Sequence, residues 1–329
     1  MLPRSRQPTV SEPPAAARGG AARGRWRPNQ QSEAYLFLLP SFAGFLLFVV
    51  IPVLGSLVLS LTEWNLLTPP RFVGLNNYTA LLARDPIFLR ALTNTLFYVV
   101  TIVPLQLALG LALALALNQR IHGLGFYRLI YFMPVVSSAV AAALIFQWMF
   151  NRDFGIVSAL FWELGTWTGL PIAPPDWLNS SAWAKPAVVL LVVWKNVGFT
   201  MVIYLAGLQA VPQELYEAAT VDGAGAWARF RHVTLPLISP TSFFLLVIQM
   251  IGAFQLFSEP FVMTRGQGGP AHATKSLVFY IWESGFRYSQ MGKASAVAWV
   301  LFAIIFVCTL AQNIGQRRWV HYEAEEGGR

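Results

Sequence analysis

Residues 91–119 read ALTNTLFYVVTIVPLQLALGLALALALNQ, a run of apolar and small polar side chains without a single charge. A membrane-crossing helix needs about 20 such residues, because each adds about 1.5 Å towards a hydrocarbon core about 30 Å thick. The stretch is long enough to cross a bilayer once. A helix is the expected form, since lipid offers no hydrogen-bond partner to free backbone groups.

The same pattern recurs along the chain. Four further charge-free runs are long enough to cross, and one more is interrupted by Lys195 alone. The four runs span residues 34–62, 129–151, 232–258 and 294–316, and the interrupted one spans about 186–208. No alternating pattern typical of a membrane β-barrel is visible. The sequence therefore predicts an all-α polytopic membrane protein with six transmembrane helices.

The composition agrees with this fold class. Of the 329 residues, 56% are hydrophobic and 12% are charged, whereas a soluble domain has about 45–50% apolar and about 25% charged residues. Such a chain cannot cover a water-facing surface, which argues against a soluble enzyme, a nucleic-acid-binding module and a disordered scaffold.

The net charge of +8 comes largely from the N-terminus, where residues 1–31 carry six arginines among Pro, Ala, Gly and Ser. We expect a flexible basic cytoplasmic tail that contacts anionic lipid and binds no nucleic acid. With this tail inside, the inner segments hold 13 Lys and Arg and the outer loops hold 9. Without the tail, the balance reverses, so the positive-inside rule leaves the orientation open.

Little in the sequence indicates chemistry. Cys308 is the only cysteine, which excludes an intrachain disulfide, and the four histidines show no metal-binding spacing. There is no phosphate-binding glycine loop and no nucleophile motif, so we expect neither ATP hydrolysis nor another enzyme activity in this chain. A self-sufficient secondary transporter is a rival reading, but it would need its own coupling-ion site and a repeated half.

Residues 212–236 read PQELYEAATVDGAGAWARFRHVTLP and differ from the apolar runs around them. We expect a short helix from Pro212, because proline is well tolerated at a helix start, and an end at Gly223, which can take the left-handed conformation. A second amphipathic stretch follows, with Trp227 and Phe230 three residues apart. The segment is thus predicted to form a helix–turn–helix elbow against the membrane face.

The elbow also resembles a known motif. It resembles the EAA motif of binding-protein-dependent ABC importer permeases. The matching residues are Glu217, Ala218 and Ala219, then Gly223 after three residues, then, after nine more residues, Val233-Thr234-Leu235-Pro236, with Val233 in place of the usual isoleucine. Asp222, Ala224 and Phe230 match the extended form found in sugar permeases. Further stretches resemble the maltose-type first permease subunit, namely residues 72–78, 94–95, 131–134, 205–209 and 263–270. The resemblance therefore covers about residues 33–322.

This resemblance implies a type I ABC importer permease fold in the plasma (inner) membrane, with both termini cytoplasmic. It implies a first helix and an extracytoplasmic loop over 32–90, a core permease domain over 91–313 and a cytoplasmic tail over 314–329. In that family the elbow inserts into a cleft of an ATPase subunit. The implied coupling residues are Glu217, Ala218, Ala219, Asp222, Gly223, Ala224, Phe230, Leu235 and Pro236.

The resemblance also implies partners: a second, different permease, two ATPase subunits, and an extracytoplasmic solute-binding protein that meets loops 151–185 and 262–293. This chain would bind no cofactor, because ATP and Mg are used by the ATPase. The implied function is import of a sugar or polyol-type solute by alternating access. Glycerol-3-phosphate or another small organic solute is the alternative within the same class.

Polar residues inside membrane spans are costly and usually face a partner or a cavity. Asn196 and Thr200, four residues apart, share one helix face, and so do Gln255 and Glu259, whereas Gln249 points away from Gln255. Two readings stay open: these groups line a solute path, or they pair with one another or with the second permease. Lys195 would suit an anionic solute or a structural ion pair. The candidate path residues are Lys195, Asn196, Thr200, Gln249, Gln255 and Glu259, with Trp148, Trp194 and Phe254 expected to stack on sugar rings.

Overall fold

The computed structural model describes residues 30–119, 122–317 and 319–320. The six arginines of the N-terminal tail, Arg120, Arg318 and all residues after Val320 lie outside the described residues. The chain divides into two compact units, Met1–Val53 and Leu54–Arg329, which are described separately. The predicted domain boundaries at residues 31, 90 and 313 are not tested by this division and stay predictions.

The described part of the first unit is helical. It contains α1 (Gln30–Phe45), the π-helix η1 (Leu46–Val50) and the first residues of α2 (Ile51–Ser60). Large apolar side chains along it are exposed, Phe37 and Phe48 among them. A helix with apolar side chains on all sides is typical of one surrounded by lipid.

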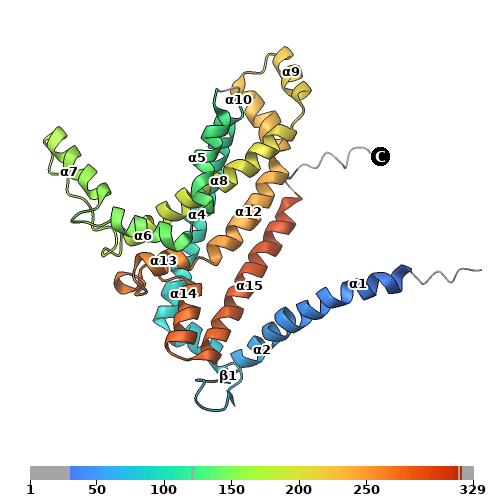
Figure 1. Ribbon diagram of the computed structural model, residues 1–329, viewed down its shortest axis with the longest axis vertical. Helices are drawn as coiled ribbons and strands as arrows, with labels where there is room; N and C mark the ends of the chain where they lie inside the picture. Colours follow the sequence, from blue (N-terminus) through green and yellow to red (C-terminus); the bar gives the residue numbers. More distant parts are fainter. Residues whose placement is uncertain (1–29, 120–121, 318, 321–329) are drawn as a thin grey trace, which may run out of the picture. The chain divides into compact units, whose positions relative to one another are not determined.

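The described part of the second unit is mainly helical, with one small hairpin. The hairpin pairs β1 (Thr62–Glu63) with β2 (Arg71–Phe72) in antiparallel register. The α-helices, several of them labelled in Figure 1, are α3 (Asn76–Arg84), α4 (Pro86–Leu117), α5 (Leu124–Val136), α6 (Ala139–Met149), α7 (Ile156–Thr168), α8 (Ala184–Ala210), α9 (Gln213–Val221), α10 (Ala226–Arg229), α11 (Leu235–Leu237), α12 (Ser239–Phe254), α13 (Ser258–Met263), α14 (Leu277–Trp282) and α15 (Met291–Gln316). The other helical turns are η2 (Phe230–Thr234) and η4 (Glu283–Arg287), both π-helices, and the 3₁₀-helix η3 (Pro270–His272).

Within the described residues, five helical segments are long and apolar enough to cross a membrane, and a sixth candidate is a bent pair. The five are Phe37–Ser60, Pro86–Leu117, Ala184–Ala210, Ser239–Met263 and Met291–Gln316. The all-α prediction is confirmed, and the count reaches the predicted six only if the bent pair is one span.

The bent pair corrects the prediction of a straight crossing over 129–151. Helices α5 and α6 meet at 97°, because Ser137 and Ser138 both have extended backbone, with ψ of 148° and 132°. At about 1.5 Å per residue, the 13 and 11 residues of these helices reach only about 20 Å and 16 Å. A charge-free run reports hydrophobicity and says nothing about straightness.

The long helices of the second unit pack closely where small residues meet. Helix α8 lies against α4 and α5, and α12 lies against α4 and α15 (Figure 1). At the α5–α8 contact, a Cβ added to Gly198 would overlap the backbone carbonyl of Tyr131. Small residues allow such close approach of helices in membranes, and Gly198 therefore sets the spacing of this pair.

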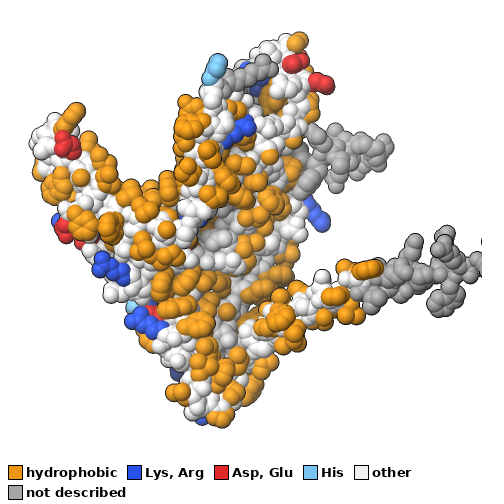
Figure 2. Space-filling view, in the orientation of Figure 1, with side chains coloured by type: hydrophobic (Ala, Val, Ile, Leu, Met, Phe, Trp, Pro, Cys, Tyr) orange, Lys and Arg blue, Asp and Glu red, His pale blue; other side chains and the backbone are white. Residues whose placement is uncertain are grey.

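The ends of the second unit differ in character. Helices α9 and α10 lie at one end, and β1 and α14 lie at the opposite end (Figure 1). Figure 2 shows hydrophobic side chains over much of the surface between these ends, and acidic side chains near the tip of α9. The elbow is therefore at the opposite end of the helices from the hairpin and α14.

Candidate functional site

The turn at the tip of the elbow is a complete helix-ending motif. The N–H of Gly223 donates to the carbonyl of Thr220 at 3.1 Å, and the N–H of Ala224 donates to the carbonyl of Ala219 at 2.9 Å. These two bonds, with Gly223 at φ +78°, form the Schellman motif that satisfies the last carbonyls of a helix. The predicted helix end at Gly223 is confirmed, and Pro212 is the N-cap just before the first helical residue.

The two halves of the elbow are joined by side chains. The hydroxyls of Tyr216 on α9 and Thr234 on η2 share a hydrogen bond of 3.0 Å, and Arg229 donates to the Thr220 hydroxyl at 3.0 Å. Tyr216 and Val233 also pack against the apolar cluster at this end of α4, α8 and α12. The elbow is thus a braced element. Its second half differs from the predicted single amphipathic stretch, because η2 is a π-helical turn.

The outer surface of the elbow is open. Of the nine predicted coupling residues, five are exposed and four are half-buried: Glu217, Ala218, Asp222, Gly223 and Leu235 are exposed, and Ala219, Ala224, Phe230 and Pro236 are half-buried. Two apolar side chains extend this surface, Val221 at 88% exposure and Trp227 at 70%. The elbow therefore offers small and apolar side chains, flanked by two carboxylates, to another surface. Val221 was not among the predicted coupling residues, although its side chain is on this surface.

A second feature is a cavity of about 350 Å³ between α4, α8, α12 and the break before α13, which we call the amide cavity. Its lining contains four carboxamide side chains and one carboxylate. These are Gln106, Asn196, Gln249, Gln255 and Glu259. The rest of the lining is Ile102, Val192, Phe199, Ile248, Gly252, Ala253, Leu256, Phe257 and Ser258.

Three of the four carboxamides, those of Gln106, Asn196 and Gln249, are oriented by hydrogen bonds through their nitrogens. Asn196 and Gln106 both donate to the carbonyl of Val192, at 3.0 Å and 3.2 Å, and Gln249 donates to the hydroxyl of Thr200 at 2.6 Å. The oxygen of Gln106 has no partner among the described residues. An amide both donates and accepts, so this wall can match the hydroxyl groups of a bound solute.

The structure changes the predicted relation of the path residues. Gln255 and Glu259 do not share one helix face, because α12 ends at Phe254 and Phe257 has φ −138° and ψ −58° before α13 begins. Both still line the amide cavity, from the two sides of this break. Gln249, predicted to point away from Gln255, lines the same cavity. Helical periodicity was wrong here because the helix is broken.

Two of the predicted path residues do not line the amide cavity. Thr200 is fully buried behind Gln249, and Lys195 is half-buried outside the lining. The charge of Lys195 acts on Glu259, yet within the described ranges the two form no ion pair of 4.0 Å or less. Gln106 was missed, although a glutamine in the middle of the charge-free run 91–119 is the kind of signal that marks a cavity.

The expected aromatic residues also lie elsewhere. Trp194 packs on Phe146 with ring centroids 5.0 Å apart, Phe254 is buried in the core, and Trp148 lines a different pocket. Phe199 and Phe257 are the aromatic residues on the wall of the amide cavity. In the part of the chain that the structure describes, no group of three or more His, Cys, Asp or Glu is placed to hold a metal ion.

The chain is similar to known transport proteins. Residues 88–321 match the family described as "Binding-protein-dependent transport system inner membrane component". The chain is 37% identical over 293 residues to the probable ABC transporter permease protein YesP of Bacillus subtilis (strain 168), covering 89% of this chain and 93% of that protein. It is 36% identical over 288 residues to the lactose transport system permease protein LacF of Rhizobium radiobacter, covering 87% and 94%.

The fold is also found in a solved structure. A chain of a bacterial ABC transporter involved in the import of the acidic polysaccharide alginate matches with a TM-score of 0.71 and 24% identity, covering 88% of this chain and 96% of that chain. The likeness confirms the predicted importer permease fold. The family match and the apolar helices together lead to one conclusion: the chain is a multi-pass membrane protein of the binding-protein-dependent transport system inner membrane component family, and a transport subunit rather than an enzyme.

Proposed function

We propose that this chain is one of two membrane subunits of an ATP-driven importer that carries a sugar or a related polyol-type solute by alternating access. The amide cavity is the observation that carries the proposal. Four carboxamides and one carboxylate face a space of about 350 Å³, which is within the range of about 300–1,000 Å³ typical of small-molecule sites.

The lining favours an uncharged, hydroxyl-rich solute. Amides pair with hydroxyls as both donors and acceptors, and the lactose permease relative belongs to a sugar transport system. A phosphate-bearing solute would need a cation on the wall. The described lining contains neither Lys nor Arg, and its one ionisable group is Glu259. Glycerol-3-phosphate is therefore the weaker candidate.

The elbow is the proposed contact with an ATPase. Ala218 and Ala219 allow a foreign surface to approach closely, and the exposed Glu217 offers an anionic contact to a basic partner. Because the elbow is braced by the Tyr216–Thr234 bond, closure of two ATPase subunits on ATP and Mg would move the attached helices as a two-state element. This chain itself would bind no cofactor.

The proposed orientation follows from the elbow. With the bent pair counted as one of six spans, an elbow on the cytoplasmic side would put both termini there, with the N-terminal helix and loop at 32–90, the core at 91–313 and the tail at 314–329. Loops 151–185 and 262–293 would then meet an extracytoplasmic solute-binding protein. A second, different permease would complete the path in the plasma membrane.

Uptake by the reconstituted importer tests the proposal. The chain is assembled in proteoliposomes with its partner permease, ATPase and binding protein, and uptake of lactose, maltose, raffinose, glycerol and glycerol-3-phosphate is measured with and without ATP. We expect ATP-dependent uptake of at least one saccharide or polyol, and none by the lone chain. Transport by the lone chain, or uptake of glycerol-3-phosphate alone, would overturn the proposed function.

A further inference from the structure

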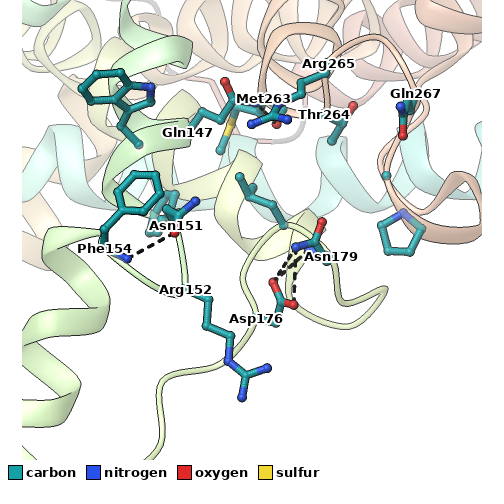
Figure 3. A pocket seen from close by; sticks show the side chains of 15 residues that line it. Gln147, Asn151, Arg152, Phe154, Asp176, Asn179, Met263, Thr264, Arg265 and Gln267 are labelled. Carbon is teal, nitrogen blue, oxygen red and sulfur yellow. Dashed lines mark hydrogen bonds between the residues drawn. The ribbon is translucent and has the colours of Figure 1, made fainter.

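A second pocket lies at the opposite side of α13 from the amide cavity. It encloses about 410 Å³ between the end of α6, the loop before α8 and the segment after α13, and we call it the loop pocket. Figure 3 shows Gln147, Met263, Thr264 and Arg265 along one rim, and Asp176 and Asn179 on a loop facing them. The lining is Gln147, Trp148, Phe150, Asn151, Arg152, Phe154, Asp176, Leu178, Asn179, Met263, Thr264, Arg265, Gln267, Gly269 and Pro270.

The chemistry of this wall differs from that of a lipid-facing groove. Four carboxamide side chains line it, together with one carboxylate and two guanidinium groups. Two aromatic side chains, Trp148 and Phe154, are 73% and 71% exposed. Aromatic faces provide large contact area, and amides pair with hydroxyls. This combination of flat apolar faces and amide groups fits a saccharide ring.

One wall of the loop pocket is a tightly constructed loop. Gln147 donates to the carbonyl of Met263 at 3.2 Å, and the N–H of Gly268 donates to the Thr264 hydroxyl at 3.1 Å. Lys275, which is 1% exposed, packs its stem next to Gly268 and forms a buried ion pair with Glu283. These contacts thus hold the loop in place before any ligand binds.

The backbone of the same loop is strained at the pocket. Arg265 has φ +51° although it is not glycine, and its side chain lines the pocket. Such a conformation is energetically unfavourable for a residue other than glycine and tends to occur at binding and active sites. Gln267, also on the wall, is exposed, and its carboxamide has no hydrogen-bond partner within the described ranges. Both side chains are therefore available to a ligand.

The two cavities share one short helix. Ser258 and Glu259, at the start of α13, line the amide cavity, and Met263, at its end, lines the loop pocket. Six helical residues extend about 9 Å at about 1.5 Å each. The two pockets are therefore lined by opposite ends of one short helix.

We propose that the loop pocket is a second saccharide-binding subsite, which holds a sugar unit on its way to the amide cavity. Trp148 stacks on the ring and Arg265 bonds its hydroxyl groups, with Gln267 beside them in the lining. The inference rests on the proposed function, because it takes the same solute class. It adds a site that the sequence pattern did not indicate.

Local protection from a thiol reagent tests this subsite. In a Cys308→Ser background, Gln267→Cys reports on the loop pocket and Gln255→Cys on the amide cavity. The full importer, in nanodiscs and without its binding protein, is treated with a small charged methanethiosulfonate. The saccharide used is the sugar of the uptake panel that the wild-type importer carries. When the saccharide concentration is three times the dissociation constant of a site, the fraction of importers with that site free falls to about a quarter. Labelling of the cysteine at that site should therefore slow about fourfold.

Two variants separate the loop pocket from the amide cavity. Adding Trp148→Ala should abolish protection at Gln267→Cys and leave protection at Gln255→Cys. The matched control is Trp162→Ala, since Trp162 is an exposed tryptophan of α7 outside the lining, and it should preserve both.

The outcomes distinguish the two proposals. Unchanged labelling of Gln267→Cys in saccharide overturns the subsite, whether or not Gln255→Cys is protected. Protection that survives Trp148→Ala also overturns it, because Trp148 would then not hold the ring. If the wild-type importer carries no saccharide at all, the proposed function fails, and the subsite fails with it.

Discussion

The ammonium group of Lys275 donates a hydrogen bond to the carboxylate of Glu283, and the two side chains are only 1% and 5% exposed. Arg287 approaches the other carboxylate oxygen of Glu283 at 3.4 Å. The carbonyl of Lys275 also accepts from Asn94 on α4 at 2.9 Å. Lys275 therefore ties the wall of the loop pocket to α4 through its carbonyl and to the α14–η4 segment through its buried ion pair.

Breaking this pair should destabilise the chain strongly. In Lys275→Met the Glu283 carboxylate is left buried without its main partner, which typically costs about 3–5 kcal/mol. Thermal unfolding of the detergent-solubilised chain measures the loss. The double variant Lys275→Met/Glu283→Leu should recover most of it, because no buried charge remains. The control is Arg71→Met, which breaks an exposed 3.8 Å pair with Glu63 and should cost less than about 1 kcal/mol. Equal losses from the two single variants would contradict this view of Lys275.

Asp85 should make stability depend on acid pH. Burial raises the pKa of this carboxyl, but hydrogen bonds from Lys293 and Tyr280 outweigh that and hold the pKa below its ordinary value. Ionised Asp85 therefore stabilises the fold above the unfolded-state pKa of about 3.9. This contribution is lost as the pH falls through the lower folded-state pKa. The unfolding midpoint should drop more steeply with acidification in the wild type than in Asp85→Asn. Parallel curves between pH 6 and pH 3 would refute the assignment.

Gly198 should tolerate no larger residue. A valine there would push α8 away from the Tyr131 backbone of α5, and such overpacking typically costs about 1–3 kcal/mol. The matched control is Gly125→Val on α5, where no atom lies within 4 Å of an added Cβ. The yield and melting midpoint of the folded chain should fall in Gly198→Val only. Similar values for both variants would mean that the α5–α8 spacing is not set by Gly198.

Removing single amide groups from the amide cavity should weaken its affinity for the solute. Removing one solute-facing amide in Gln255→Ala or Asn196→Ala removes a hydrogen bond worth about 0.5–1.5 kcal/mol. The dissociation constant for the solute should therefore rise about two- to tenfold. Equilibrium binding of the imported saccharide to the complex, without its binding protein, measures this. Gln209→Ala, an exposed glutamine of α8 outside the cavity, should leave the affinity unchanged. An equal effect of Gln209→Ala would argue against a solute site in this cavity.

The sequence was most informative where the signal was local. Charge-free runs predicted the helices, since a lipid-embedded helix needs only apolar length, and Gly223 predicted the elbow turn because few other residues adopt φ +78°. The bend at Ser137 was not predictable, because hydrophobicity is the same on both sides of it. The grouping of Gln249 with Gln255 depends on a broken helix, which a regular periodicity cannot show. The loop pocket is built by residues distant in the chain, and only tertiary packing brings Gln147 to Met263.

We propose that the turn at Gly223 shapes the elbow for contact with an ATPase. A valine at Gly223, with φ +78°, should distort the turn at a cost of about 1–2 kcal/mol. The same change at Gly225, with φ −67° and open space around it, should be tolerated. The decisive measurement is ATP-dependent solute uptake by the reconstituted importer, with ATPase co-purification recorded for each variant. We expect Gly223→Val to lose uptake and retain less ATPase, and Gly225→Val to match the wild type. Equal uptake by the two variants would contradict it.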